Sequence, residues 1–280
     1  MTYIKLVIGV TDKYQEALIA ELFDMDFDGF QQQEGRILAY ITKEKFGIGD
    51  REVLEQLLAS YPGNGFIESE EVVADQNWNE QWEKTIQAQS IGRFFVKPTW
   101  SQEKVPAGKI LLEIDPKMSF GTGYHETTRL ILRLMSDLVK EDDLVIDAGT
   151  GTGILSIAAI KLGAKYAFAF DIDDWSISNA SENIMLNGVA DFITVQKGST
   201  EVIPKGKKVD VLFANIERNT IIDLLPDFYE ALKEKGHLVL SGLLDNDKRA
   251  VLSELEGKFE IKSIPVEGEW VAIHAQKVSL

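Results

Sequence analysis

From residue 144 onward, short apolar runs alternate with longer amphipathic segments. The apolar runs predict strands at 144–147, 166–171, 192–196, 209–215 and 237–241. The segments between them predict helices, and two last apolar runs, 259–265 and 270–277, predict a closing antiparallel pair. This alternation is typical of an α/β fold with a mostly parallel, doubly wound, Rossmann-like sheet that carries helices on both faces.

The first 75 residues follow a different order, strand-helix-strand-strand-helix-strand, which predicts a small ferredoxin-like α/β domain. A helical segment then places Trp78 and Trp82 on one face, a spacing that we interpret as packing. We therefore expect an N-terminal domain over 1–75, a linker helix over 76–90 and a larger domain over 91–280.

Composition narrows the class of protein. The 280 residues contain no cysteine, and 29 basic against 45 acidic residues give a net charge of −16. Such a charge repels nucleic acid and anionic lipid and attracts a basic protein, less strongly at high salt. No apolar run reaches the roughly 18 residues of a membrane helix, so we expect no membrane contact. The absence of cysteine fits a cytoplasmic protein, and the negative charge argues against direct nucleic-acid binding. The three histidines lack metal-ligand spacing, and we expect no metal.

The strand predicted at 144–147 ends in Asp147 and leads into a glycine-rich turn with Gly149, Gly151 and Gly153. Glycines let the backbone turn sharply and leave room for a ligand. Dinucleotide sites usually have the spacing G-x-G-x-x-G, and here the third glycine comes one residue early. The turn alone favours a methyl donor only slightly over a nucleotide.

Two further strands end in polar residues that should meet at the same edge of the sheet. Asp171 ends its strand and can accept hydrogen bonds from both hydroxyls of a ribose, whereas Asp173 is placed to cap the next helix. Asn215 can accept a hydrogen bond from a substrate amine through its oxygen, with an Asx turn as the alternative.

The segment from Phe120 to Thr128 precedes a predicted helix and is rich in glycine and hydroxyl groups. It contains Phe120, Thr122 and Gly123, which we assign to the same site. His125 is either a base or, more commonly for a lone histidine near a helix start, a structural residue.

Taken together, these residues resemble the ribosomal protein L-eleven methyltransferase (PrmA) family of class I S-adenosylmethionine-dependent enzymes. The matching stretches run from about residue 76 to 277 and include Glu113-Ile114-Asp115-Pro116, Phe120-Gly121-Thr122-Gly123, Thr127-Thr128, Gly153-Ile154-Leu155, Asp171-Ile172-Asp173 and Ala214-Asn215-Ile216. The F-G-T-G-x-H-x-T-T segment is the most specific of them.

The resemblance implies S-adenosylmethionine as cofactor and methylation of lysine and N-terminal amines of the ribosomal protein, which the N-terminal domain would hold. It implies that Thr128, Gly149, Asp171 and Asn215 contact the cofactor. We add four neighbouring residues to this cofactor-binding set: Phe120, Thr122, Gly123 and Gly151. Asn215 is the candidate catalytic residue, and a monomer is expected.

Glu217 departs from the family, which has an apolar residue there, and adds a charge that can face an amine. The alternatives are a class I methyltransferase acting on another protein or a small amine, and a nicotinamide-dependent oxidoreductase. The shortened glycine spacing argues against the oxidoreductase.

Overall fold

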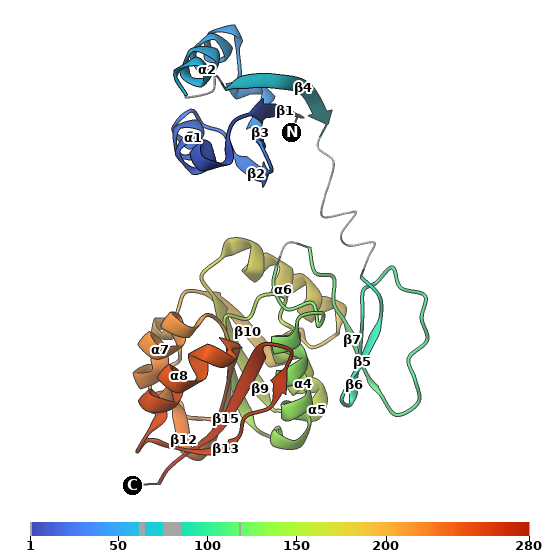
Figure 1. The fold of residues 1–280 in the computed structure, drawn as a ribbon. Coiled ribbons are helices and arrows are strands. Elements are labelled where there is room, and N and C mark those ends of the chain that lie inside the picture. The colour runs from blue at the N-terminus through green and yellow to red at the C-terminus, as the bar shows by residue number, and fades with distance from the viewer. Residues whose placement is uncertain (1, 62–64, 75–85, 118, 280) are drawn as a thin grey trace. The chain divides into compact units, whose positions relative to one another are not determined.

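The structure is a computed structural model that describes residues 2–61, 65–74, 86–117 and 119–279 (Figure 1). The chain divides into two compact units, Met1–Trp78 and Asn79–Leu280. None of the helices within the described ranges has the length and apolar content of a membrane span. Each unit is taken by itself below.

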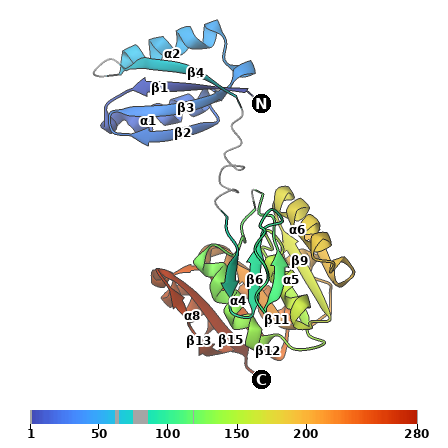
Figure 2. The same cartoon turned by 90° about the vertical axis from the view of Figure 1, so that its right-hand side faces the viewer.

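The first unit is an antiparallel sheet covered by two helices on one face (Figure 2). Its elements are β1 (Thr2–Gly9), α1 (Asp12–Asp24), β2 (Gly29–Gln33), β3 (Arg36–Thr42), α2 (Ile48–Ser60) and β4 (Phe66–Ala74), with sheet order β2-β3-β1-β4. Alternate residues of β1, Ile4, Leu6 and Ile8, are buried against both helices, because side chains of a strand point to opposite faces in turn. This arrangement confirms the ferredoxin-like prediction.

The second unit is built on a sheet in which five neighbouring strands are parallel. In sheet order these are β10 (Ile193–Lys197), β9 (Tyr166–Asp171), β8 (Leu144–Ala148), β11 (Val209–Asn215) and β12 (Leu232–Leu244). The antiparallel β15 (Trp270–Lys277) and β13 (Phe259–Ser263) complete the order, and β14 (Val266–Glu267) pairs with β15. The strand order reverses between β8 and β11, which confirms the doubly wound prediction.

Helices cover both faces of this sheet, and adjacent residues of a strand belong to different hydrophobic cores. Val145 packs with α4 (Glu126–Leu138), α5 (Ile154–Leu162) and α6 (Asp174–Leu186), whereas Ile146 packs with α7 (Arg218–Ala231) and α8 (Lys248–Leu255). Burial on both faces explains why these strands read as continuous apolar runs rather than as alternating patterns.

The strand expected at 237–241 is longer in the structure. It begins at Leu232, directly after α7 ends at Ala231, because Leu232 already pairs with Val209. A small sheet of β5 (Gln89–Ile91), β6 (Phe94–Lys97) and β7 (Ile110–Glu113) stands beside the main one. Most of the predicted linker helix lies outside the described residues, and 86–88 are irregular, so the three domain boundaries stay predictions.

Candidate functional site

A cleft of about 410 Å³ opens where the strand order reverses, at the carboxyl ends of β8, β9 and β11. Five of the eight predicted site residues line it: Phe120, Gly149, Gly151, Asp171 and Asn215. Residues from four separate segments of the chain therefore meet in one place, as the strand-end argument predicts.

The glycine turn forms one wall of the cleft and has no room for side chains. Gly149 and Gly151 have positive φ values of 70° and 54°. A Cβ atom on Gly149 would lie 2.3 Å from Cγ2 of Ile216, and one on Gly151 would lie 2.2 Å from the Phe120 carbonyl oxygen. The turn thus needs glycine both for its backbone conformation and for the close approach of neighbouring segments.

The turn is hydrogen-bonded to the segment that precedes α4. The Thr152 amide donates to the Phe120 carbonyl at 2.9 Å, and the Thr152 hydroxyl donates to the Gly121 carbonyl at 2.5 Å. Two walls of the cleft that are about 30 residues apart in sequence are therefore held together by the protein's own bonds.

Asp171 faces the cleft from the end of β9, and both of its oxygens accept backbone bonds. Oδ2 accepts from the Gly151 amide at 2.9 Å and Oδ1 from the Asp173 amide at 3.1 Å. Asp173 instead caps α6, accepting from the Ser176 amide at 2.9 Å, a bond that comes first among the causes lowering its pKa. The structure therefore separates the two acids as the sequence analysis did.

Asn215 carries an unsatisfied acceptor next to the cleft. Its Nδ2 donates to the hydroxyl of Thr128, a fully buried residue of α4, at 3.3 Å. Its Oδ1 is buried and has no hydrogen-bond partner among the described residues. An unpaired buried acceptor costs about 1–3 kcal/mol, so this oxygen is placed to take a donor from a bound molecule.

Below the glycine turn lies Asp147, a residue that the sequence analysis noted but did not assign to the site. It is fully buried, and burial raises the pKa of its carboxyl against the opposing effect of its hydrogen bonds. Oδ2 accepts from the hydroxyls of Thr150 and Ser156, both at 2.7 Å, and from the Ser156 amide at 3.1 Å. Asp147 thereby joins the turn to the start of α5.

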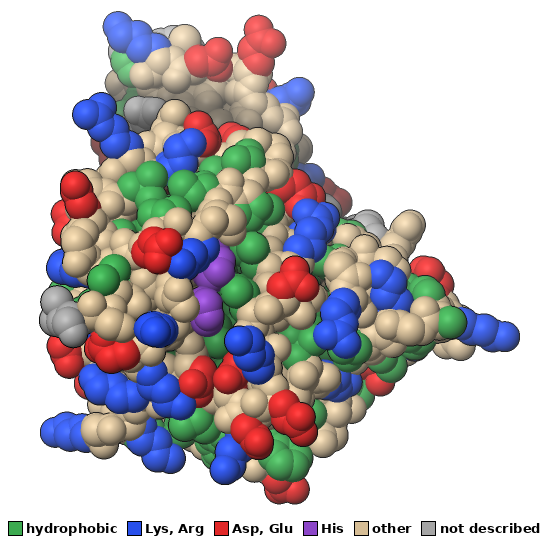
Figure 3. Space-filling model, turned by 90° about the horizontal axis from the view of Figure 1, so that it is seen from below, with side chains coloured by type: hydrophobic (Ala, Val, Ile, Leu, Met, Phe, Trp, Pro, Cys, Tyr) green, Lys and Arg blue, Asp and Glu red, His purple; other side chains and the backbone are tan. Residues whose placement is uncertain are grey.

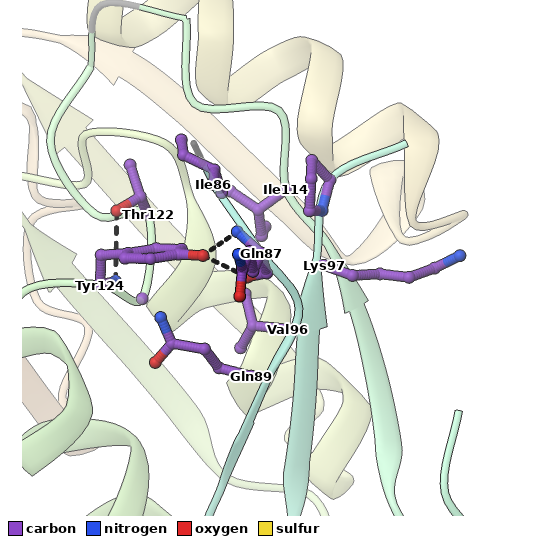
Figure 4. Close-up of a pocket in the computed structure, with 10 residues that line it drawn as sticks. Ile86, Gln87, Gln89, Val96, Lys97, Ile114, Thr122 and Tyr124 are labelled. Carbon is purple, nitrogen blue, oxygen red and sulfur yellow. Dashed lines mark hydrogen bonds between the residues drawn. The ribbon is translucent and has the colours of Figure 1, made fainter. Parts of the chain in front are cut away.

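Thr122 and Gly123 do not line this cleft. They border a neighbouring crevice with Val96, where the Thr122 hydroxyl accepts from the Tyr124 amide at 3.2 Å (Figure 4). In the same crevice the Tyr124 hydroxyl bonds to the backbone amide and carbonyl of Gln87. Their assignment to cofactor binding stays a prediction, and their position indicates a role in shaping the segment before α4.

His125 takes the structural alternative. Its Nδ1 accepts from the Thr127 amide at 3.4 Å, which makes it the N-cap of α4. Its ring packs edge-on against Trp270 at 4.6 Å and lies 5.1 Å from the ring of Phe120. Within the described ranges, no group of three or more His, Cys, Asp or Glu side chains is arranged to hold a metal ion.

The sequence analysis missed six cleft residues: Phe170, Ser176, Gly198, Ser199, Thr220 and Leu224. Phe170 lies on β9 and Ser176 on α6, the next two follow β10, and the last two lie on α7. The two residues after β10 could have been predicted, because they follow the end of a parallel strand. The sequence does not indicate which side of α7 faces the cleft.

The chain matches the family model described as ribosomal protein L11 methyltransferase (PrmA) over residues 8–278. A protein of Caldanaerobacter subterraneus subsp. tengcongensis named ribosomal protein L11 methyltransferase is 38% identical over 217 residues, 77% of this chain and 69% of that protein. One of the same name from Syntrophomonas wolfei subsp. wolfei is 33% identical over 246 residues, 85% of this chain and 80% of that protein.

Among solved structures, that of a ribosomal protein L11 methylase from Lactobacillus delbrueckii subsp. bulgaricus superposes with a TM-score of 0.63 at 32% identity. The match covers 69% of this chain and 100% of that chain.

Proposed function

The chain belongs to the ribosomal protein L11 methyltransferase family, and from this premise we propose that it methylates lysine and N-terminal amines of ribosomal protein L11. It is a protein methyltransferase that uses S-adenosylmethionine. The observation that carries the proposal is the unpaired Oδ1 of Asn215 beside a cleft of cofactor size.

The cleft residues suit S-adenosylmethionine. Gly149 and Gly151 form a wall with no side chains, Asp171 presents a carboxylate that can accept hydroxyl bonds, and Asn215 offers an unpaired oxygen. Thr128 does not line the cleft, and its buried hydroxyl holds the Asn215 amide instead. When bound, this donor supplies a methyl group already activated by its sulfonium. The protein then has to align the acceptor amine and exclude water.

The acceptor amine must be neutral to attack, which decides what the side chains have to do. A lysine amine has a pKa of about 10.4 and an α-amine one of about 7.7–8.0, so lysine is almost fully protonated at neutral pH. Burial in the cleft favours the neutral amine, and Asn215 Oδ1 can accept one of its N–H bonds and direct its lone pair. This requires no strong base, in keeping with the capping role of His125.

We further propose that the N-terminal unit holds the ribosomal protein and that the enzyme acts as a monomer in the cytoplasm without binding nucleic acid. The net charge of −16 supports attraction of a basic protein and repulsion of RNA.

Mass spectrometry of ribosomal protein L11 after incubation with the enzyme and S-adenosylmethionine tests the substrate. We expect added masses that are multiples of one methyl group, located on lysine and N-terminal amines, and none when the donor is left out. Transfer of labelled methyl groups to another ribosomal protein, with L11 unmodified, would overturn the proposed substrate and leave the enzyme class intact.

A further inference from the structure

Glu217 is an exposed acid that lines the cleft two residues beyond Asn215. It occupies the N-cap position of α7, yet its side chain makes no capping bond to the helix backbone. Among the described residues, its Oε1 accepts from the hydroxyl of Thr220 alone, at 3.1 Å. The carboxylate therefore forms no direct cap of α7, and the helix start favours it only through the positive end of the helix dipole.

The charge of Glu217 has no counter-ion in the part of the chain that the structure describes. The adjacent Arg218 turns away and donates to Asp247 at 2.8 Å and to Asn219. Asp171, the other acid among the described residues that line the cleft, differs because it accepts two backbone bonds. Glu217 therefore leaves an unneutralised negative charge at the cleft wall.

We propose that Glu217 is a specificity-determining residue that selects a cationic amine at the mouth of the cleft. This inference rests on the proposed function and deepens it. A carboxylate attracts an ammonium group and binds it in preference to a neutral or acidic side chain. The buried Asn215 oxygen can also accept a hydrogen bond from the neutral amine. Glu217 thus recruits the protonated substrate, which loses its proton to solvent before it reaches Asn215. Glu217 itself takes up no proton and leaves the transfer step unchanged.

Binding of small lysine mimics tests the selection without the ribosomal protein. The full chain, loaded with S-adenosylhomocysteine, is titrated with n-butylammonium and with the neutral n-butanol and followed by NMR chemical shifts. Because exposed ion pairs are modest and screened by salt, we expect the wild type to prefer the cation by roughly threefold to fivefold at low ionic strength. Glu217→Gln should remove that preference, and Glu254→Gln, the same charge change on α8, should keep it.

Two results would overturn the inference. One is an unchanged preference for the cation in Glu217→Gln. The other is a loss of affinity for S-adenosylhomocysteine in Glu217→Gln as large as the loss of affinity for n-butylammonium. That result would place Glu217 in the donor site instead. Equal melting temperatures of the variants and wild type establish that the fold is retained.

Kinetics with the ribosomal protein provide a second readout. We expect Glu217→Gln to raise KM for that substrate by roughly threefold to fivefold at low salt, with kcat unchanged and a weaker salt dependence. A fall in kcat at constant KM would contradict recruitment. If the wild type leaves the ribosomal protein unmodified, the proposed substrate fails, and the titration with n-butylammonium still decides the role of Glu217.

Discussion

At the residue scale, Gly151 is the position where the backbone of the cleft has the least space. Alanine there would place its Cβ 2.2 Å from the Phe120 carbonyl oxygen and push apart two walls of the cleft. We expect Gly151→Ala to weaken methyl-donor binding by about tenfold or more, equivalent to at least about 1.4 kcal/mol, in calorimetric titrations.

Gly108 offers a matched control, because its φ of 77° is also left-handed and a Cβ there would meet nothing within 4 Å. Gly108→Ala should cost about 1–2 kcal/mol of stability from backbone strain alone and leave donor affinity unchanged. Equal donor affinities for the two variants would show that the close approach at Gly151 does not shape the site.

Asn215 gives a second prediction at this scale. Removing its amide deletes the only buried acceptor on β11 that lines the cleft and lacks a partner among the described residues. We expect Asn215→Ala to lower kcat by roughly tenfold to 100-fold, the equivalent of about 1–3 kcal/mol, in a methyl-transfer assay. Thr128→Val, which removes the hydroxyl that accepts from the amide, should have a smaller effect. Full turnover in Asn215→Ala would rule out the alignment role.

Sequence alone could identify Gly149, Asp171 and Asn215, because strand ends and glycine spacing mark them directly. It could not identify Thr220 and Leu224, because their approach to the cleft depends on how α7 is rotated against the sheet. It could not tell that Asn215 Oδ1 stays unpaired, since that depends on Thr128 bonding to the other end of the amide.

At the scale of elements, an ion-pair network ties α4 to the β14–β15 hairpin. Glu267 Oε1 accepts from Arg129 at 2.7 Å, and its Oε2 accepts from Arg133 at 2.5 Å. Burial would raise the pKa of Glu267, but the hydrogen bonds from these arginines outweigh it and lower the pKa. Arg129 also donates to the Tyr124 carbonyl, so the network reaches the segment before α4.

We expect Glu267→Gln to lower the melting temperature and to weaken donor binding by a few-fold, because a neutral amide cannot hold both arginines. Its stabilisation in the wild type should be lost as pH falls below the usual pKa of 4.5, since the pKa is lower in the folded state. Thermal melts at a series of pH values measure the stability and its pH dependence, and calorimetric titration measures the donor affinity. Glu260→Gln on β13, whose partner Lys262 lies at 2.6 Å on the same strand, is the control and should change neither property.

A histidine pair joins β12 and β15. Figure 3 shows histidine side chains, in purple, among acidic and basic side chains. His237 Nδ1 and His274 Nε2 are 3.0 Å apart, a hydrogen bond that requires at least one neutral ring. Burial lowers the pKa of both, and the nearby charges of His237 and Lys262 help bring that of His274 to about 4. The folded state therefore resists protonation more than the unfolded chain.

Because the folded pKa is lower than 6.5, stability should fall as pH drops from 6.5 towards 4. Between pH 7 and pH 5 we expect a loss of about 1–2 kcal/mol from this pair, measured by urea unfolding. His274→Gln should flatten that part of the profile, and an unchanged profile would contradict the neutral pair.

Element boundaries were predictable where a single residue type enforces them. Gly163 ends α5 in a left-handed conformation, and Asp173 starts α6 as its cap. The end of α7 was not predictable in the same way, because pairing of Leu232 with a distant strand overrides the local helical pattern.

At the scale of the whole molecule, the alternating pattern was sufficient to predict a doubly wound unit after a ferredoxin-like one. Parallel strands that are buried on both faces appear in the sequence as continuous apolar runs. The first unit could be recognised from its order of strands and helices along the chain. The segments 93–97 and 109–114 can be recognised as strands from their sequence, and they form β6 and β7. The three-residue β5 and the pairing of all three strands into a separate sheet were not predicted, since no local pattern specifies which strands pair.

The acidic surplus of the molecule has a consequence for the order in which small molecules come and go. S-adenosylmethionine carries one net positive charge at neutral pH, and S-adenosylhomocysteine, after the methyl group has left, carries none. A protein of charge −16 with Asp171 and Glu217 at its cleft thus attracts the incoming donor and not the spent product.

We expect the association rate of the donor, measured by stopped-flow fluorescence, to fall several-fold from low to physiological salt while that of the product stays constant. Equal salt dependence for both would contradict this. When donor and product compete for the cleft, the negative charge of the protein favours the donor and so reduces product inhibition. This reduction should be larger at lower salt concentration.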